Sequence, residues 1–191
     1  ICFVGKIDLP LFLQQKLEVK EGDVVEIFPS FYKEKRLESK DLEQLAKPYN
    51  YQLSDGKPIG KHNGAHFFTI GQRKGLGIGG HQNPLFVIST DVINNIIYVG
   101  EGQEHPGLFR SALHMDIAES HWIRPDLKLK IGEEIEVMVR IRYRQPLQSA
   151  KLILIGNGLY LLFKEPQRGI TPGQFAAWYI DDELIGSGVI S

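Results

Sequence analysis

The sequence predicts a mainly β protein with short helices, and three observations lead to that fold class. Apolar, β-branched or aromatic runs of strand length recur along the chain, turn signals separate several of them, and only two segments have helical character. Short strands at this spacing are typical of antiparallel sheets or a small barrel. We expect strands at residues 24–28, 66–70, 85–89, 96–99, 135–143, 151–155, 159–163, 175–180 and 184–190.

Two segments have the signals of short helices. In residues 8–17, Asp8 can cap the helix and Pro10 suits its first turn. Ser39 opens a second helical stretch that has acids in its first turn and ends near Pro48. A boundary between two parts of the chain is expected near Ser111, after a polar stretch that contains proline and glycine.

Composition limits the class of protein. Hydrophobic residues make up 42% of the 191 residues, which is ordinary for a globular chain, and no apolar run is long enough to cross a bilayer. The start at Ile1 has neither an initiator Met nor a signal peptide, so we expect a cut inside a longer chain. A single cysteine excludes an internal disulfide framework and favours a reducing, cytoplasmic setting.

The net charge is −1, so any binding of nucleic acid must use local patches. Residues 56–90 contain no Asp or Glu, and this window is either a basic patch or a chance gap in acids. Its basic side chains are Lys57, Lys61, Arg73 and Lys74, together with His62, His66 and His81. These histidines lack the spacing of metal ligands, and we expect no metal site.

The glycine-dense segment 71–80 does not match the ATP-binding pattern GxxxxGK[ST]. Its glycines permit close approach of the backbone, and Arg73 and Lys74 could meet a phosphate backbone. The alternative is a long connecting loop.

Three arginines alternate along the strand predicted at 135–143 and its continuation. Alternation would place them on one face, about 7 Å apart, where they repel one another unless an anion lies across them. RNA phosphates would meet that need. The alternative is salt bridges to acids on neighbouring strands, such as Glu133, Glu134 or Glu165. The three side chains are Arg140, Arg142 and Arg144.

Two further residues have a possible chemical role. The Cys2 thiolate could attack, carry a persulfide sulfur or form a transient disulfide, but a lone cysteine between Ile1 and Phe3 is also typical of a small buried residue. Gln174 closes a segment rich in proline and glycine, where it could contact a base or sugar edge or belong to a structural turn.

Several segments together resemble the tRNA-specific 2-thiouridylase family, which installs sulfur at C2 of the wobble uridine. They are ICFVG, GKHNGAHFFTIGQRKGLGIGG, DVINNIIYVGEGQEHPGL, VRIRYRQPL, FKEPQRGITPGQFAAWY and LIGSGVIS. The resemblance implies the tail of a missing ATP-using domain at 1–15, a small central tRNA-binding β domain at 16–111 and a C-terminal antiparallel β-barrel at 112–191. It also implies that this fragment alone is inactive.

The resemblance implies roles for single residues. Cys2 stands where the family has a catalytic cysteine, which takes a persulfide from a sulfur-donor protein and delivers the sulfur. It then forms a disulfide with a cysteine of the missing domain. ATP is implied to bind that domain, with no metal in this part. Residues at or near segments implied to touch tRNA are Arg142, Tyr143, Gln174, Arg140, Arg144, Arg73 and Lys74.

Residues 26–53 form a longer segment than the family pattern leads us to expect. We interpret the helix from Ser39 as a solvated insertion, because its surface carries charges of both signs. Two other functions stay open from the residues themselves. One is a stand-alone RNA-binding β module with a structural Cys2. The other is a protein-interaction domain whose arginines pair with acids.

Overall fold

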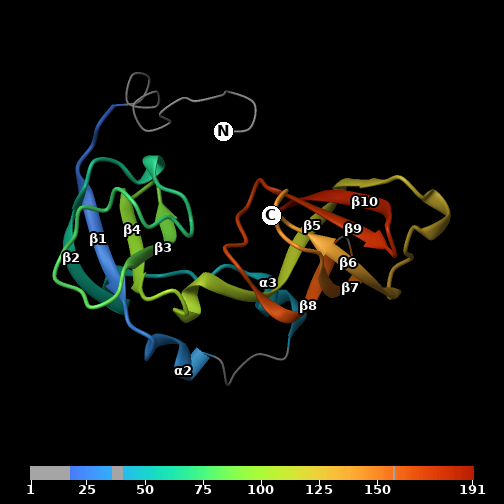
Figure 1. Cartoon of the computed structure of the whole chain (residues 1–191), viewed down its shortest axis with the longest axis horizontal. Helices are drawn as coiled ribbons and strands as arrows, with labels where there is room; N and C mark the ends of the chain where they lie inside the picture. The colour runs from blue at the N-terminus through green and yellow to red at the C-terminus, as the bar shows by residue number, and fades with distance from the viewer. Residues whose placement is uncertain (1–17, 36–40, 157) are drawn as a thin grey trace. The chain divides into compact units, whose positions relative to one another are not determined.

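The computed structural model describes residues 18–35, 41–156 and 158–191, and within them it confirms a mainly β fold with short helices (Figure 1). The described residues form two compact units. One contains residues 18–32 and 50–108, and the other contains residues 33–35, 41–49, 109–156 and 158–191. The two units are defined by contacts between residues and not as domains. The expected domain limits at 16–111 and 112–191 therefore stay a prediction.

The first unit is built on a four-stranded sheet with the order β2-β1-β4-β3 (Figure 1). β1 and β4 run parallel and the other pairs are antiparallel, so the sheet is mixed. Its core gathers side chains from three strands, including Val24, Val87 and Ile97, which are fully buried. The strands are β1 (Gly22–Ile27), β2 (Gly56–His62), β3 (Leu85–Asp91) and β4 (Ile96–Glu101).

The glycine-dense loop is anchored to this sheet. Leu76 is buried in the core of the first unit, and Ile78 packs against that core. Backbone bonds between the loop and β3 join the nitrogen of Gly71 to the oxygen of Val87, and the nitrogen of Val87 to the oxygen of Gln72. The loop is therefore a folded cover, even though it contains neither a helix nor a strand.

One predicted strand in this unit is wrong. The segment 66–70 holds no strand, because Ala65–Phe67 forms a 3-10 turn in which the nitrogen of Phe67 donates to the oxygen of Gly64. The sequence pattern also failed to indicate β2, whose sequence GKPIGKH has too few apolar residues to show alternation. It pairs along the whole of β1 all the same. Main-chain hydrogen bonds, not side-chain pattern, define that strand.

The second unit is a closed six-stranded barrel with the order β10-β5-β8-β7-β6-β9, in which β9 also pairs with β10. Every pair is antiparallel, which confirms the predicted antiparallel barrel. The strands are β5 (Phe109–Trp122), β6 (Glu134–Arg140), β7 (Gln148–Ile155), β8 (Gly158–Arg168), β9 (Phe175–Ile180) and β10 (Glu183–Ile190).

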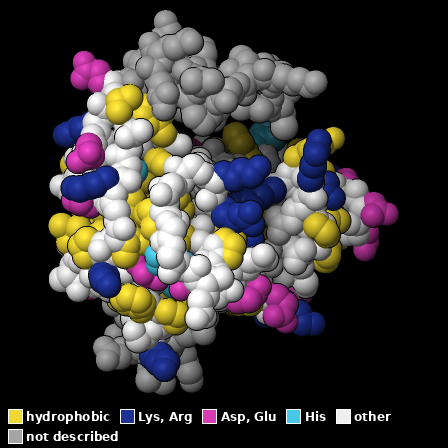
Figure 2. All heavy atoms as spheres, turned by 60° about the vertical axis from the view of Figure 1, so that its left-hand side comes forward, with side chains coloured by type: hydrophobic (Ala, Val, Ile, Leu, Met, Phe, Trp, Pro, Cys, Tyr) yellow, Lys and Arg dark blue, Asp and Glu magenta, His cyan; other side chains and the backbone are white. Residues whose placement is uncertain are grey.

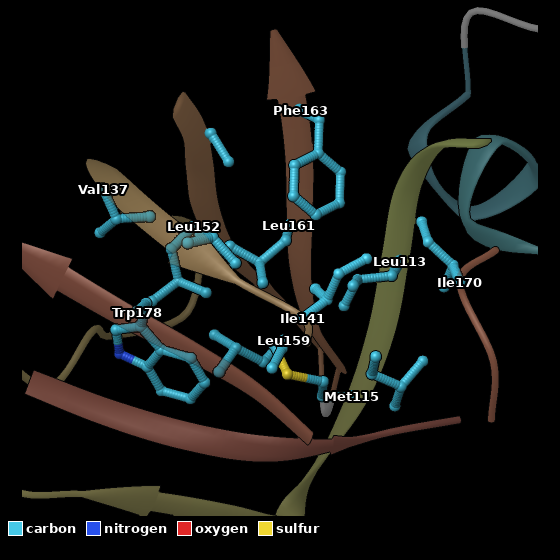
Figure 3. Close-up of a cluster of buried hydrophobic side chains, with 14 of the residues drawn as sticks. Leu113, Met115, Val137, Ile141, Leu152, Leu159, Leu161, Phe163, Ile170 and Trp178 are labelled. Atoms are coloured by element: carbon cyan, nitrogen blue, oxygen red, sulfur yellow. The ribbon is translucent and has the colours of Figure 1, made fainter. Parts of the chain in front are cut away.

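Alternating apolar residues of these strands fill the barrel (Figure 3). Trp178 is fully buried at its centre and contacts Trp122 with ring centroids 5.5 Å apart. Ile170, which belongs to the β8–β9 connection and to no strand, is also part of this core and is 3% exposed. The connection is therefore held to the barrel by an apolar anchor.

The second predicted helix is present, but the expectation that it is solvated is wrong, and its being an insertion stays a prediction. α3 (Leu42–Ala46) begins after Asp41, whose side chain accepts a hydrogen bond from the nitrogen of Glu43. Ala46 packs with Ala112 and Tyr160 on the outside of the barrel. A further short helix, α2 (Phe31–Lys35), was not predicted.

The helix predicted at 8–17 and the expected start at Ser39 lie outside the described residues. Among the described residues, no helix has the length and apolar character that spanning a membrane requires.

Candidate nucleic-acid interface

One end of the barrel gathers the arginines that the sequence singled out. The strand registers set this end: Arg110 of β5 lies opposite Gln167 of β8, and Arg140 of β6 lies opposite Ala177 of β9. The β6–β7 turn and the β8–β9 connection cross the same end. We name this end, made of residues 109–110, 140–148 and 165–176, the arginine rim.

The prediction that three arginines share one face of a strand is wrong. β6 ends at Arg140, and the nitrogen of Gln145 donates to the oxygen of Arg142 to close a turn. Arg142 and Arg144 therefore belong to that turn. Pro146 has no N–H to donate, so it cannot extend the ladder. The arginines are still brought together, but by the end of the barrel and not by strand alternation.

Arg142 holds the β8–β9 connection in place. Its Nη2 donates to the backbone oxygen of Gly169 over 2.7 Å. Gly169 has a φ of +65° and is packed so closely against the Arg142 guanidinium that a β-carbon there would overlap it. Only glycine meets both conditions without strain. Arg142 thus has a structural role in addition to any contact with a ligand.

Arg110 holds the next residue of the same connection. Its guanidinium donates to the backbone oxygen of Ile170 and to that of Ala46, each over 2.8 Å. Burial lowers the pKa of Arg110 to about 10, so the group is still charged at neutral pH. This one side chain ties the end of α3 to the rim, and the sequence reasoning did not identify it.

A chain of glutamines completes the support of the rim. Gln145 donates from Nε2 to Oε1 of Gln167 over 2.7 Å, and Gln167 donates to the backbone oxygen of Glu165 over 2.8 Å. Gln167 is only 5% exposed. The sequence around Gln167 does not indicate that this glutamine is buried, because its partner Gln145 lies in the turn of a different hairpin.

Of the remaining predicted residues of the rim, Tyr143 and Arg144 are exposed, and Arg140 and Gln174 are partly buried. The side chain of Tyr143 at the tip of the turn is 84% exposed, and Arg144 is exposed beside it. Nε of Arg140 and Oε1 of Gln174 are buried, and neither has a hydrogen-bond partner among the described residues. Buried polar atoms usually have a partner, so these two atoms leave hydrogen-bonding capacity unused at the rim.

Two ion-paired acids of the barrel lie at its other end, whereas Glu165 is exposed within the rim itself. Glu134 pairs with Lys151 over 2.7 Å, and Glu183 pairs with Arg124 over 2.9 Å. Within the described part of the chain, no ion pair is recorded for Arg140, Arg142 or Arg144. Figure 2 shows a face on which lysine and arginine side chains gather in one group. Salt bridges therefore do not account for these arginines.

In the first unit, Arg73 and Lys74 are both exposed at the glycine-dense loop. Arg73 lines a hollow of about 440 Å³, whose other walls are loop glycines, Leu76, Ile78, Pro84 and Leu85. The window at 56–90, which contains no acid, carries less uncompensated positive charge in the folded chain than its sequence indicates. The reason is that Lys61 pairs with Asp23 of β1 over 2.8 Å. Within the described residues no helix directly follows the loop, so the loop lacks the helix N-terminus of an ATP phosphate site.

Cys2 lies outside the described residues. Its expected role as a sulfur-carrying nucleophile is therefore unchanged by the geometry, and the site that the structure supports is the arginine rim.

Comparisons with known proteins agree with this architecture. Residues 113–190 match the family described as an aminomethyltransferase beta-barrel domain, and residues 46–101 match the tRNA methyl transferase PRC-barrel domain. The chain is also similar over its whole length to proteins named tRNA-specific 2-thiouridylase MnmA. Identity is 54% to that of Christiangramia forsetii, 55% to that of Flavobacterium johnsoniae and 48% to that of Karelsulcia muelleri.

The resemblance to the tRNA-specific 2-thiouridylase family is confirmed. The chain spans about half the length of the relatives it matches: 50% of the first two and 49% of the third. The names of these 2-thiouridylases give tRNA as the molecule on which they act. The residues matched to the barrel family, 113–190, include β6 to β10 and most of β5, whereas Arg110 of the rim precedes them.

We predict that replacing Arg110 by Met destabilises the barrel by about 2–4 kcal/mol, because two backbone oxygens lose a charged donor. Both tryptophans, Trp122 and Trp178, are in the barrel, so urea unfolding followed by tryptophan fluorescence reports on this unit. Arg144→Met is the matched control, and it should change stability by less than about 0.5 kcal/mol. An unchanged urea midpoint for Arg110→Met would contradict the role of Arg110.

Proposed function

We propose that this chain is part of a tRNA-uridine 2-sulfurtransferase and that its arginine rim holds the tRNA. The observation that carries the proposal is the rim itself, where the barrel gathers Arg140, Arg142 and Arg144, none of which forms an ion pair within the described residues. An exposed tyrosine stands at the tip of the same turn. The 2-thiouridylase relatives that match the whole chain support tRNA as the substrate.

Each side chain of the rim has a distinct part in this proposal. Arg144 and Arg142 neutralise phosphates of the tRNA backbone, which is the main source of affinity for nucleic acid. Tyr143 offers an aromatic face on which an unstacked base can lie. Gln174 would contact a base or sugar edge through its side-chain amide, whose Oε1 is buried in the chain without tRNA and would have to become accessible. Arg140 lies behind them on β6 and adds positive charge.

The glycine-dense loop of the first unit supplies a second contact. Arg73 and Lys74 are exposed, and the positive φ angles of Gly71 and Gly75 leave the backbone accessible for close approach. We propose that this loop meets tRNA phosphates as well.

For the chemistry, we propose that Cys2 is the catalytic nucleophile. Its thiolate takes the outer sulfur of a persulfide on a donor protein, and the donor leaves as a thiol. The outer sulfur of the Cys2 persulfide then attacks C2 of the wobble uridine, and the C2 oxygen leaves in activated form. A second cysteine finally attacks Sγ of Cys2, which breaks the S–S bond, releases the thiolated uridine and forms a disulfide with Cys2. The use of ATP stays an expectation of the family, and we assign no step through it to the described residues. The chain alone should form no thiouridine.

A cytoplasmic location agrees with this chemistry, because a reducing compartment keeps a lone thiol free to accept sulfur.

The binding of tRNA should depend strongly on salt and on the rim. We predict that Arg144→Ala weakens binding and lowers the slope of log K against log salt by about 0.7–0.9, the loss of one phosphate contact. Fluorescence anisotropy with labelled tRNA over a range of salt concentrations measures this slope. Arg124→Ala is the control, because Arg124 lies at the other end of the barrel in pairs with Asp126 and Glu183. Equal slopes for the two variants would contradict the proposal.

Replacement of Tyr143 in the same assay distinguishes the contribution of base stacking to tRNA binding from that of charge. Tyr143→Ala should weaken tRNA binding by about tenfold at every salt concentration, because stacking does not release counterions. Ile131→Ala is the control, since Ile131 is 73% exposed beyond the rim. A rim that serves only as a general anion site would show no loss in Tyr143→Ala.

The role of Cys2 has its own test. A cysteine desulfurase and ³⁵S-cysteine should label the chain with sulfur that a reducing thiol removes, and Cys2→Ser should carry no label. Cys2 is the only cysteine of the chain, so the label has one possible protein site. Absence of label from the unmodified chain, while a small thiol reagent still reacts with Cys2, would exclude the catalytic assignment.

A further inference from the structure

Three side chains of the first unit, far apart in sequence, bring ligand atoms together beside the sheet. Glu26 comes from β1, Glu101 from the end of β4, and His81 from the loop that precedes β3. β1 and β4 pair in parallel with Glu26 opposite Val99, which places the two acids at neighbouring strand ends. One ligand atom from each of the three lies within 4.8 Å of the others.

Glu26 is the feature that needs an explanation. It is a buried acid with only 8% of its side chain exposed, and a buried carboxylate is unfavourable unless a cation or donors compensate it. Lys57 lies opposite it in the β1–β2 register but is exposed, and no ion pair between the two is recorded within the described residues. The compensating group must come from elsewhere.

His105, which is near Glu26, does not supply that charge. Burial lowers the pKa of His105, while its bond to Ile27 and the charge of Glu26 act in the opposite direction and more weakly. Nε2 of His105 donates to the backbone oxygen of Ile27 over 2.9 Å, and Nδ1 accepts from the nitrogen of Gly107 over 3.3 Å. The ring is therefore a neutral imidazole with both nitrogens in use.

His81 is the direct partner of Glu26. Nδ1 of His81 is 3.3 Å from the backbone oxygen of Gly79, which only accepts, so a proton on Nδ1 has an acceptor there. Nε2 lies 3.2 Å from Oε2 of Glu26, which is also an acceptor when ionised. Either a proton on Nε2 or a metal ion must therefore lie between these two atoms.

The surroundings resemble the support of a metal site. A histidine ligand commonly donates its other ring N–H to a backbone carbonyl, and the carbonyl oxygen of Gly79 lies 3.3 Å from Nδ1 of His81. The carboxylate of Glu101 is fixed in the same way, because its Oε1 accepts from the nitrogen of Asn83 over 2.7 Å. Nitrogen and oxygen ligands at about 2.0–2.2 Å from a tetrahedral Zn²⁺ lie slightly over 3 Å apart, which is the separation of Nε2 and Oε2.

We propose that Glu26, His81 and Glu101 bind one divalent transition metal ion such as Zn²⁺, with solvent completing the coordination. The histidine nitrogen favours a transition metal over Mg²⁺ or Ca²⁺, which prefer oxygen ligands. The ion would fasten the loop 71–83 to β1 and β4. Because Arg73 and Lys74 are on this loop, the ion would also order a basic segment of the chain. The site is independent of the proposed function, since its residues are outside the barrel.

Titration of the chain with Zn²⁺ against a competing chelator tests the site. One Zn²⁺ should bind per chain, and His81→Ala or Glu101→Gln should weaken binding by at least about 100-fold, since changes behind the ligands alone cause losses of about 10–100-fold. His121→Ala and Glu104→Gln are matched controls, because both residues are exposed and lie outside the cluster. Glu26→Gln should weaken binding as well. Because Glu26 is buried and its replacement can also affect folding, the variants of His81 and Glu101 are the ones that test the proposal.

Two further readouts distinguish this site from binding of Zn²⁺ elsewhere on the chain. Co²⁺ in place of Zn²⁺ should show no thiolate charge-transfer band, which distinguishes the cluster from binding at Cys2. Zn²⁺ should slow hydrogen exchange of the amides at 79–83, and a chelator should reverse the effect. Failure of the chain to bind Zn²⁺, or binding by His81→Ala as tight as by the unmodified chain, would overturn the proposal. A proton on Nε2 of His81 would then join His81 to Glu26.

Discussion

Closure of the barrel by the pairing of β6 with β9 is the constraint on which the candidate site depends. That pairing sets Met138 opposite Tyr179 and Arg140 opposite Ala177, so the end of β6 and the start of β9 must lie at the same end of the barrel. The connection from β8 to β9 then has to cross this end. The folded state would lose stability if the backbone oxygens of this connection were buried without hydrogen-bond donors.

Two arginines meet that need, and in doing so they create the interface. Arg142 donates to Gly169 and Arg110 donates to Ile170, while the side chain of Ile170 fills the barrel core (Figure 3). The same charges that satisfy the connection give this end a positive character, and within the described residues no ion pair joins Arg140, Arg142 or Arg144 to an acid. Arg142 and Arg110 therefore both hold the connection in place and contribute to the positive charge of the rim.

Much of the fold could be predicted from the sequence, because apolar alternation marks strands such as β3, β4, β7 and β9. β2 was missed because GKPIGKH has no such alternation, and β5 because its polar start and end hide a 14-residue strand. The strand predicted to run through residue 143 ends at Arg140, since a turn closed by a backbone hydrogen bond follows it. Local pattern cannot show where such a bond forms.

The candidate site could be predicted only in part, for a similar reason. Motifs pointed to Arg142, Tyr143 and Gln174, and the structure places all three at one end of the barrel. Arg110 was missed because its partners are 60 and 64 residues away in the sequence. Glu26 and His81 are 55 residues apart, so the spacing of histidines gave no sign of the cluster that they form with Glu101. Long-range contacts of this kind exist only in the folded chain.

The most direct measurement of the central claim is hydrogen exchange of the chain with and without tRNA. Binding at the arginine rim should slow exchange of backbone amides in 141–147 and 169–174, while amides at the other end of the barrel, in 124–134 and 181–184, should be unchanged. Protection confined to that other end, with tRNA bound, would contradict the assignment of the rim as the tRNA-binding surface.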